Sequence, residues 1–239
     1  MILEHVSSPA DIRSLDVPHL RVLAAECRQV ILDTCSTNGG HLASNLGAVE
    51  LTIALHVALD TPTDQLVWDV GHQCYTHKLL TGRYEQFRTL RQCGGISGFV
   101  NPKESPYDTF MAGHASTSLS IAAGLVAARR LNGGTQRVVA VIGDGALSGG
   151  MALEALNNLG RTQGQCLIIL NHNDMSISRS VGGMAQALNR LRTRSWYLRA
   201  RQSAFVGRGL RWLRTLLKRL YLPTVMFEEL GFRYFGVVD

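Results

Sequence analysis

The amino-acid sequence predicts an α/β fold in which helices cover both faces of a parallel sheet. Apolar runs occupy residues 65–70, 138–142 and 166–170, as expected of strands that are buried on both faces. Each run is followed by glycine or polar residues, and good helix formers at 151–159 separate the last two runs. Because strand–helix–strand crossovers are right-handed, these two strands should lie parallel in one sheet.

The first part of the chain predicts two helices before the strand at 65–70. Apolar side chains recur at helical spacing between Leu20 and Ile31, and Ser14 and Asp16 are both candidate N-caps for that helix. Small and turn-forming residues at 38–47 precede a second helix at 49–59. Glycines and prolines predict a loop over residues 84–108, and a helix is predicted at 119–131.

The composition of the chain changes after Ser178 and becomes strongly basic. Residues 190–219 hold ten basic residues and no acidic one, although the net charge of the whole chain is only +6. Arginines and leucines at helical spacing predict a basic amphipathic helix at 209–221. A strand is predicted at 234–238.

Polar residues follow two of the predicted strands and indicate a binding site. Gly143-Asp144-Gly145 follows the strand at 138–142, and Asn173 follows the strand at 166–170. Open parallel sheets bind ligands beyond the carboxyl ends of their strands, so Asp144 and Asn173 should meet there. Their oxygens suit Mg²⁺, and a helix beginning near Ser148 would offer amides to a diphosphate. The alternative is a plain corner in which Asp144 caps a helix.

Three Gly-His pairs occur where the chain is predicted to turn at one edge of the sheet. They are Gly40-His41, Gly71-His72 and Gly113-His114. One such histidine is more often structural than functional, but three at equivalent positions favour a shared role in binding phosphate and moving protons. Zinc is disfavoured, because His72 and His77 lack a third ligand at a suitable spacing.

The composition is that of an ordinary globular protein, with 46% hydrophobic and 18% charged residues in 239. Five cysteines without a CxxC spacing favour a reducing cytoplasm over a disulfide framework. The first residues have the pattern of neither a signal peptide nor a transit peptide, and no apolar run is long enough to span a membrane.

Six stretches resemble a known family. They are GGHLASNLGAVELTIALH, DQLVWDVGHQCYTHKLLTGR, AGHASTSLSIAAGL, VIGDGALSGGMALEALN, LNHNDMSIS and FEELGFRYFGVVD. In this order they cover nearly the whole chain apart from the basic segment. The chain therefore resembles the amino-terminal part of 1-deoxy-D-xylulose-5-phosphate synthase, a thiamine-diphosphate-dependent enzyme of the transketolase group.

The resemblance implies a site for thiamine diphosphate and Mg²⁺. The implied magnesium ligands are Asp144, Asn173 and the carbonyl of Met175. The implied contacts to the cofactor are His72, Gly113, His114, Ala115, Gly145, Ala146 and Asn173. His41 is implied to be a catalytic residue that handles protons beside the reactive carbon. Two positions depart from the family pattern, since His172 replaces a usual acidic residue and Thr76 a usual proline.

The resemblance also implies a reaction. Pyruvate and D-glyceraldehyde 3-phosphate would be the substrates, and 1-deoxy-D-xylulose 5-phosphate and CO₂ the products, at the entry to isoprenoid, thiamine and pyridoxal synthesis. The cofactor would carry this chemistry, while protein groups fix it and transfer protons.

Family members are much longer than this chain. The resemblance thus implies one incomplete diphosphate-binding domain over residues 1–239, in which residues 179–222 form a basic segment expected to be mobile. The expected partner is a second copy in a homodimer, or a complementary chain with the pyrimidine-binding domain. Alone, the chain is expected to bind the cofactor weakly and to be inactive.

Two other functions stay open at the level of sequence. One is a diphosphate-binding subunit of a split transketolase-like enzyme. The other is a non-catalytic protein that binds nucleic acid or an anionic membrane surface through residues 190–219, where aromatic residues lie among the basic ones. No nucleic-acid-binding motif accompanies this segment, which favours a solvated helix or a mobile insert instead.

Overall fold

The computed structural model describes residues 1–111, 113–171 and 225–235. Its contacts divide the chain into two compact units, Met1–Ala155 with Gln165–Ser176, and Leu156–Gly164 with Ile177–Asp239. The basic segment at 179–222 and the helix predicted at 209–221 lie outside the described residues.

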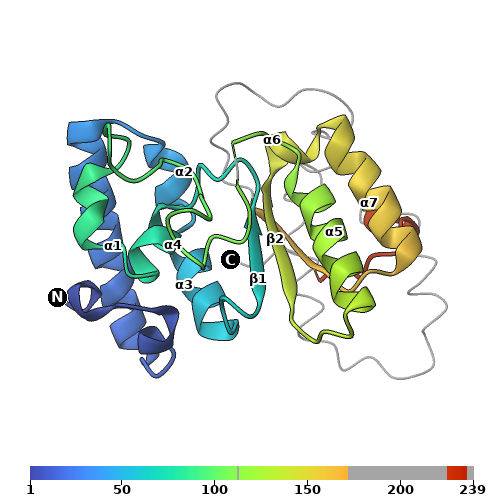
Figure 1. Cartoon of the computed structure of the whole chain (residues 1–239), viewed down its shortest axis with the longest axis horizontal. Coiled ribbons are helices and arrows are strands. Elements are labelled where there is room, and N and C mark those ends of the chain that lie inside the picture. Colours follow the sequence, from blue (N-terminus) through green and yellow to red (C-terminus); the bar gives the residue numbers. More distant parts are fainter. Residues whose placement is uncertain (112, 172–224, 236–239) are drawn as a thin grey trace, which may run out of the picture. The chain divides into compact units, whose positions relative to one another are not determined.

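The first unit contains a parallel sheet of three strands in the order β1-β2-β3 (Figure 1). The strands are β1 (Gln65–Trp68), β2 (Val138–Gly143) and β3 (Leu167–Asn171). In the register, Trp68 pairs with Val141, and Gly143 pairs with Asn171. The predicted parallel sheet is therefore confirmed. β1 stops short of the prediction because Val70 adopts a left-handed backbone conformation, with φ of 59°.

Helices cover both faces of this sheet. They are α1 (Val17–Asn38), α2 (Leu42–Leu46), α3 (Val49–Ala58), α4 (Tyr75–Leu80) and α5 (Ser118–Leu131). Leu66, Trp68, Val139 and Val141 point to one face and join the main hydrophobic cluster with side chains of α1, α3 and α4. Helix α5 packs on the opposite face and contacts β1 and β2 (Figure 1). This burial of both faces explains why the strands read as continuous apolar runs.

Local capping explains where α1 begins. Asp16, rather than Ser14, is its N-cap, and its side chain accepts a hydrogen bond from the backbone N–H of His19. Pro18 lies in the first turn, where a missing N–H costs nothing, and Gly39 ends the helix with φ of 73°.

The helix predicted to open near Ser148 begins two residues later, and a short helix that was not predicted precedes it. A short helix, α6 (Asp144–Leu147), follows β2 directly, with Gly143 in extended conformation as its N-cap. Asp144 thus occupies the first helical position, where the helix dipole favours a carboxylate. The next helix, α7 (Gly150–Thr162), begins two residues beyond Ser148 and extends past the predicted 151–159 at both ends.

The predicted loop at 84–108 contains a single short 3₁₀ helix, η3 (Glu85–Thr89). Two further 3₁₀ helices near the amino terminus, η1 (Leu3–His5) and η2 (Pro9–Ile12), precede α1. In the part of the chain that the structure describes, no helix has both the length and the apolar character needed to cross a membrane.

The second unit includes the end of α7 and α11 (Val225–Glu229). A Cβ atom added to Gly160 would lie 1.7 Å from the carbonyl oxygen of Leu230, so α7 and the turn after α11 approach closely. The rings of Phe227 and Tyr234 stack with their centroids 6.1 Å apart. The strand predicted at 234–238 is wrong for Tyr234 and Phe235, which have no strand structure, and its other residues are outside the described ranges.

Candidate functional site

Polar residues gather at the edge of the sheet where the three strands end. β1 is followed by Asp69 and, after a turn, by Gln73, while β3 ends in Asn171. The Asn171 Nδ2 donates a hydrogen bond of 2.5 Å to the Gln73 Oε1. This bond passes beside Gly143, where an added Cβ would lie 3.7 Å from the Gln73 Nε2. The residues after β1 and at the end of β3 are thus linked across the end of β2.

Two of the three predicted Gly-His histidines lie side by side at this edge. The rings of His41 and His72 have centroids 5.7 Å apart in an edge-to-face arrangement. The buried Asn45 holds both residues, because its Nδ2 donates to the carbonyl oxygens of His41 and His72 at 2.6 and 2.7 Å. Its Oδ1 accepts from the backbone N–H of Tyr75, which begins α4.

Both imidazoles keep a nitrogen available for a ligand. The Nδ1 atoms of His41 and His72 are buried, and within the described residues neither has a hydrogen-bond partner. Burial lowers the pKa of His41, and the nearby Arg91 lowers it further. Burial also lowers the pKa of His72, with a smaller contribution from His41, and Asp69 opposes the change. Two neutral imidazoles with unpaired nitrogens can donate to a phosphate or exchange a proton.

Asp69 fixes the turn that carries the third Gly-His pair. It is only 2% exposed, and its two carboxylate oxygens accept hydrogen bonds from the backbone N–H groups of Ser116 and Ser118 at 2.9 and 3.0 Å. Ser118 is the first residue of α5, so the carboxylate also faces the positive end of that helix. Ser116 has φ of 67°, a conformation that these contacts help to hold.

Ser116 also joins this turn to the residues after β2. Its Oγ donates a hydrogen bond of 2.7 Å to the carbonyl oxygen of Ala146 in α6. The predicted cofactor contacts at 113–115 and 145–146 are therefore brought together. Added Cβ atoms at Gly113 and Gly145 would meet nothing within 4 Å, which leaves room for a bulky anion beside the backbone. His114 and Ala115 are exposed.

We expect Asp69→Asn to loosen this turn. An asparagine has one acceptor oxygen, so its NH₂ group would face one of the two N–H donors and leave it without a partner. The free energy of unfolding should fall by about 1–3 kcal/mol in urea titrations, with faster amide hydrogen exchange at Ser116 and Ser118. Asp33→Asn, at an exposed position of α1, is the control. Equal behaviour of the two variants would contradict the assigned role of Asp69.

The predicted magnesium ligands are described only in part. Asp144 is half-buried at the start of α6, directly after β2. Asn173 and Met175 lie outside the described residues, as does His172. Within the described ranges, no group of three or more His, Cys, Asp or Glu side chains is placed to hold a metal ion. The magnesium site stays a prediction that rests on Asp144 and on the resemblance.

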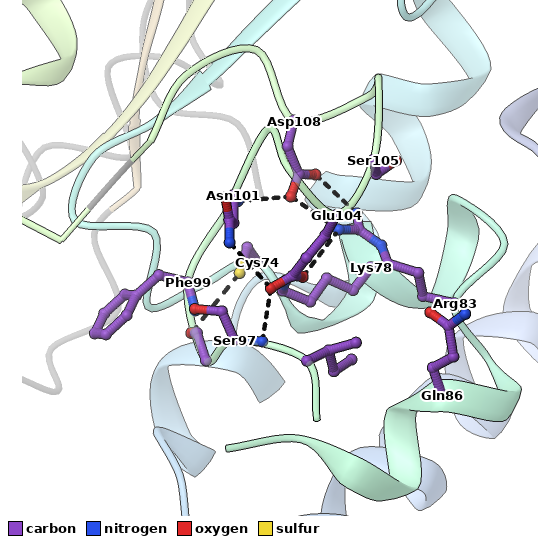
Figure 2. A network of polar contacts seen from close by, with 12 residues as sticks. Cys74, Lys78, Arg83, Gln86, Ser97, Phe99, Asn101, Glu104, Ser105 and Asp108 are labelled. Carbon is purple, nitrogen blue, oxygen red and sulfur yellow. Dashed lines mark hydrogen bonds and ion pairs between the residues drawn. The ribbon is translucent and has the colours of Figure 1, made fainter. Parts of the chain in front are cut away.

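A second polar cluster joins α3, α4 and the end of the segment at 90–108. His77 is fully buried and forms a chain with His56 and Asp108, in which His56 Nε2 and His77 Nδ1 are 2.9 Å apart and His77 Nε2 and Asp108 Oδ1 are 2.9 Å apart. Arg83 binds both oxygens of Asp108 at 2.8 Å (Figure 2). Sequence spacing did not reveal this cluster, because its hydrogen-bonded pairs are separated by 21, 25 and 31 residues in the chain.

The sequence also did not single out the residues that hold the predicted ones. Asn45, Asp69 and Gln73 are buried polar residues within stretches of small or apolar neighbours. A carboxylate or amide among apolar neighbours is expected to be buried, and it then needs hydrogen-bond partners. This sequence pattern could therefore have indicated the three residues as ones that organise the site.

Comparison with known proteins identifies the family of this chain. The family model described as 1-deoxy-D-xylulose-5-phosphate synthase matches residues 3–239. Proteins named 1-deoxy-D-xylulose-5-phosphate synthase from Caldanaerobacter subterraneus subsp. tengcongensis and Dictyoglomus turgidum are 49% and 51% identical over 250 residues, which cover all of this chain. The chain spans about 40% of the length of these relatives.

A solved structure shows the same fold. The crystal structure of a transketolase mutant from Pichia stipitis superimposes with a TM-score of 0.64 at 18% identity, over 88% of this chain and 30% of the transketolase. At this identity the likeness concerns the fold. The family match over nearly every residue goes further, and it shows that this chain belongs to the 1-deoxy-D-xylulose-5-phosphate synthase family.

Proposed function

We propose that these residues form the diphosphate-binding part of an enzyme that condenses pyruvate with D-glyceraldehyde 3-phosphate. The products are 1-deoxy-D-xylulose 5-phosphate and CO₂, so one carbon leaves and one carbon–carbon bond forms. The observation that carries the proposal is the pair His41 and His72, whose unpaired Nδ1 atoms lie at the edge where the strands end. Membership of the family supplies the reaction class.

The residues present fit thiamine diphosphate and Mg²⁺. Two orphaned imidazole nitrogens can serve a polar ligand, and the open glycines leave space beside the backbone. The Asp144 carboxylate is a hard oxygen donor of the kind that Mg²⁺ takes together with phosphate oxygens. When bound, thiamine diphosphate supplies the carbon nucleophile and the electron sink for decarboxylation of pyruvate.

Each predicted residue then has a proposed task. Asp144, Asn173 and the Met175 carbonyl hold the magnesium ion. The diphosphate is bound by His72, Gly113, His114, Ala115, Gly145, Ala146 and Asn173. His41 holds or moves a proton at its imidazole, for which a neutral ring at neutral pH is required. Asp69 and Asn45 keep these groups in place through the bonds described above.

The proposal extends to partners that complete the site. The curated relatives are longer than the stretch that this chain matches. We propose that a pyrimidine-binding domain joins the site, from a second copy in a homodimer or from a complementary chain, and that the 239 residues alone turn over no measurable substrate. We also place the enzyme in the cytoplasm, where its phosphorylated substrate would be available.

Cofactor binding tests the proposal directly. Titration calorimetry with thiamine diphosphate and Mg²⁺ should detect binding by the 239-residue chain, and Asp144→Asn should raise the dissociation constant about 10–100-fold, since a charged contact is lost. Asp33→Asn is the matched control and should bind as the parent does. Absence of magnesium-dependent binding in the parent, or an unchanged constant in Asp144→Asn, would contradict the assignment.

A further inference from the structure

Two carboxylates hold the irregular segment at residues 90–108 against α4 (Figure 2). The Glu104 Oε2 accepts from the Lys78 Nζ at 2.6 Å, and the Glu104 Oε1 accepts from the backbone N–H of Ser97 at 2.8 Å. Asp108 in turn binds the guanidinium of Arg83 and accepts from the backbone N–H of Asn101 at 2.7 Å. Each carboxylate thus ties one amide of the segment to a cation near α4.

We call Lys78, Arg83, Glu104 and Asp108 the loop anchor. Lys78 and the side chain of Asp108 are fully buried, and the Arg83 side chain is 4% exposed. Buried ion pairs of this kind hold a defined geometry, because separating the partners would leave a charge without solvent.

Phe99 lies midway between the two anchored amides, those of Ser97 and Asn101. In Figure 2 its ring points away from the loop anchor. The ring centroid is 5.8 Å from that of His41, with the planes tilted by 53°. The preceding Gly98 packs tightly, since an added Cβ would lie 3.0 Å from the Arg91 Cγ. The segment therefore delivers one aromatic ring to the site edge.

Groups from several elements lie around His41, which is half-buried. His72 faces it from the turn after β1, and the Tyr75 Oη in α4 accepts a hydrogen bond of 3.3 Å from its backbone N–H. Arg91 is the nearby positive charge, and Cys35 of α1 lies beside Gly40. Apart from Phe99, these neighbours are polar or ionisable. Among these groups, Phe99 is the apolar ring that contacts the imidazole.

We propose that Phe99 is a positioning residue for His41, and that the loop anchor holds Phe99 in place. The Phe99 ring packs against the imidazole of His41, so it limits rotation of that imidazole and shields it from water. Loss of the Phe99 ring would expose the His41 imidazole to water and favour its charged form. The importance of this arrangement for catalysis rests on the proposed role of His41 in proton transfer. The packing of Phe99 against His41 does not depend on that role.

A histidine titration by NMR tests the inference on the 239-residue chain without cofactor or substrate. With ¹³C at histidine Cε1, and His41→Gln to assign the signal, Phe99→Ala should raise the pKa of His41 by about half a unit or more, toward the value near 6.5 of an exposed histidine. Phe99→Leu, which restores an apolar wall, should recover most of the parent value. Phe110→Ala, at an exposed phenylalanine in the same part of the chain, should leave the pKa of His41 unchanged.

A second variant tests the anchor. Glu104→Gln removes the counter-charge of Lys78 and should raise the pKa of His41 in the same direction as Phe99→Ala, whereas Glu85→Gln, exposed in η3, should not. An unchanged pKa of His41 in Phe99→Ala would overturn the role of Phe99. A shift in Phe99→Ala without one in Glu104→Gln would overturn the role of the anchor. Neither result depends on cofactor binding, so failure here is separable from failure of the proposed function.

Discussion

Arg83→Met is expected to lower the free energy of unfolding by about 3–5 kcal/mol, because it leaves a buried carboxylate without its counter-ion. Asp108 is 3% exposed, and the Arg83 guanidinium binds both of its oxygens at 2.8 Å. Burial would raise the pKa of Asp108, but the bond from His77 and these contacts with Arg83 hold it far below its ordinary value. Without Arg83, burial would favour the protonated carboxyl, and taking up that proton near neutral pH would itself cost free energy.

Urea titrations followed by circular dichroism would measure this loss. Arg88→Met, at an exposed position of η3, removes the same charge and should change stability by less than about 0.5 kcal/mol. Arg83→Lys should also destabilise, since an ammonium cannot bind both carboxylate oxygens and the Thr81 hydroxyl in one plane. Similar stabilities of Arg83→Met and Arg88→Met would show that the ion pair has no such role.

A double variant separates the pair from its surroundings. If Arg83 and Asp108 stabilise each other, then Arg83→Met combined with Asp108→Asn should lose less stability than the sum of the two single changes. Strict additivity would indicate that each side chain acts through other contacts, such as those of Asp108 with His77 and the backbone of Asn101.

The strands and the edge of the sheet could be predicted because their signals are local. Apolar runs and the residues that follow them identify β2 and β3 within a residue at each end. Two of the three Gly-His pairs met as predicted, since turns at the carboxyl ends of parallel strands share one edge. The short helix α6 was not predicted, because its four residues contain no periodic pattern, only an acidic residue that suits a helix start as well as a turn.

The groups that hold the site could not be predicted, because they act across long separations in sequence. Asp69 binds amides 47 and 49 residues further along, and Asn45 binds the carbonyl of His72, 27 residues away. A buried carboxylate shows its need for partners only after the fold has buried it. The loop anchor is of the same kind, since Lys78 and Glu104 read in sequence as ordinary surface residues.

The buried histidine chain predicts the second large effect, a loss of stability as the pH falls from about 7 to about 5. Asp108 only accepts, so His77 Nε2 carries a proton, and neutral His77 then accepts at Nδ1 from His56. His56 Nδ1 in turn lies 3.2 Å from the Thr61 hydroxyl, which can donate to it. Burial lowers the pKa of His56 well below its ordinary value, and burial also lowers that of His77.

The sign follows from proton uptake. Near neutral pH both histidines are mostly neutral in the folded and unfolded chains, so their lowered pKa values have little effect on the free energy of unfolding. Below about pH 6.5 the unfolded chain binds protons that the folded chain resists, so unfolding is favoured. Each histidine that stays neutral in the folded chain lowers the free energy of unfolding by about 2 kcal/mol at pH 5. Carboxylates titrate mostly below this window, so it isolates the histidines.

His56→Gln should remove part of that loss, because the pKa values of His77, His41 and His72 are also lowered. Glutamine can donate to His77 and accept from Thr61, yet it does not titrate, so the loss between about pH 7 and about pH 5 should shrink by about 2 kcal/mol. His5→Gln, at an exposed histidine of η1, should leave the pH dependence as it is in the parent. Urea titrations at several pH values would measure both. An unaltered pH dependence in His56→Gln would mean that His56 takes up a proton in the folded chain, and that the Thr61 hydroxyl and His77 Nδ1 accept from the resulting imidazolium.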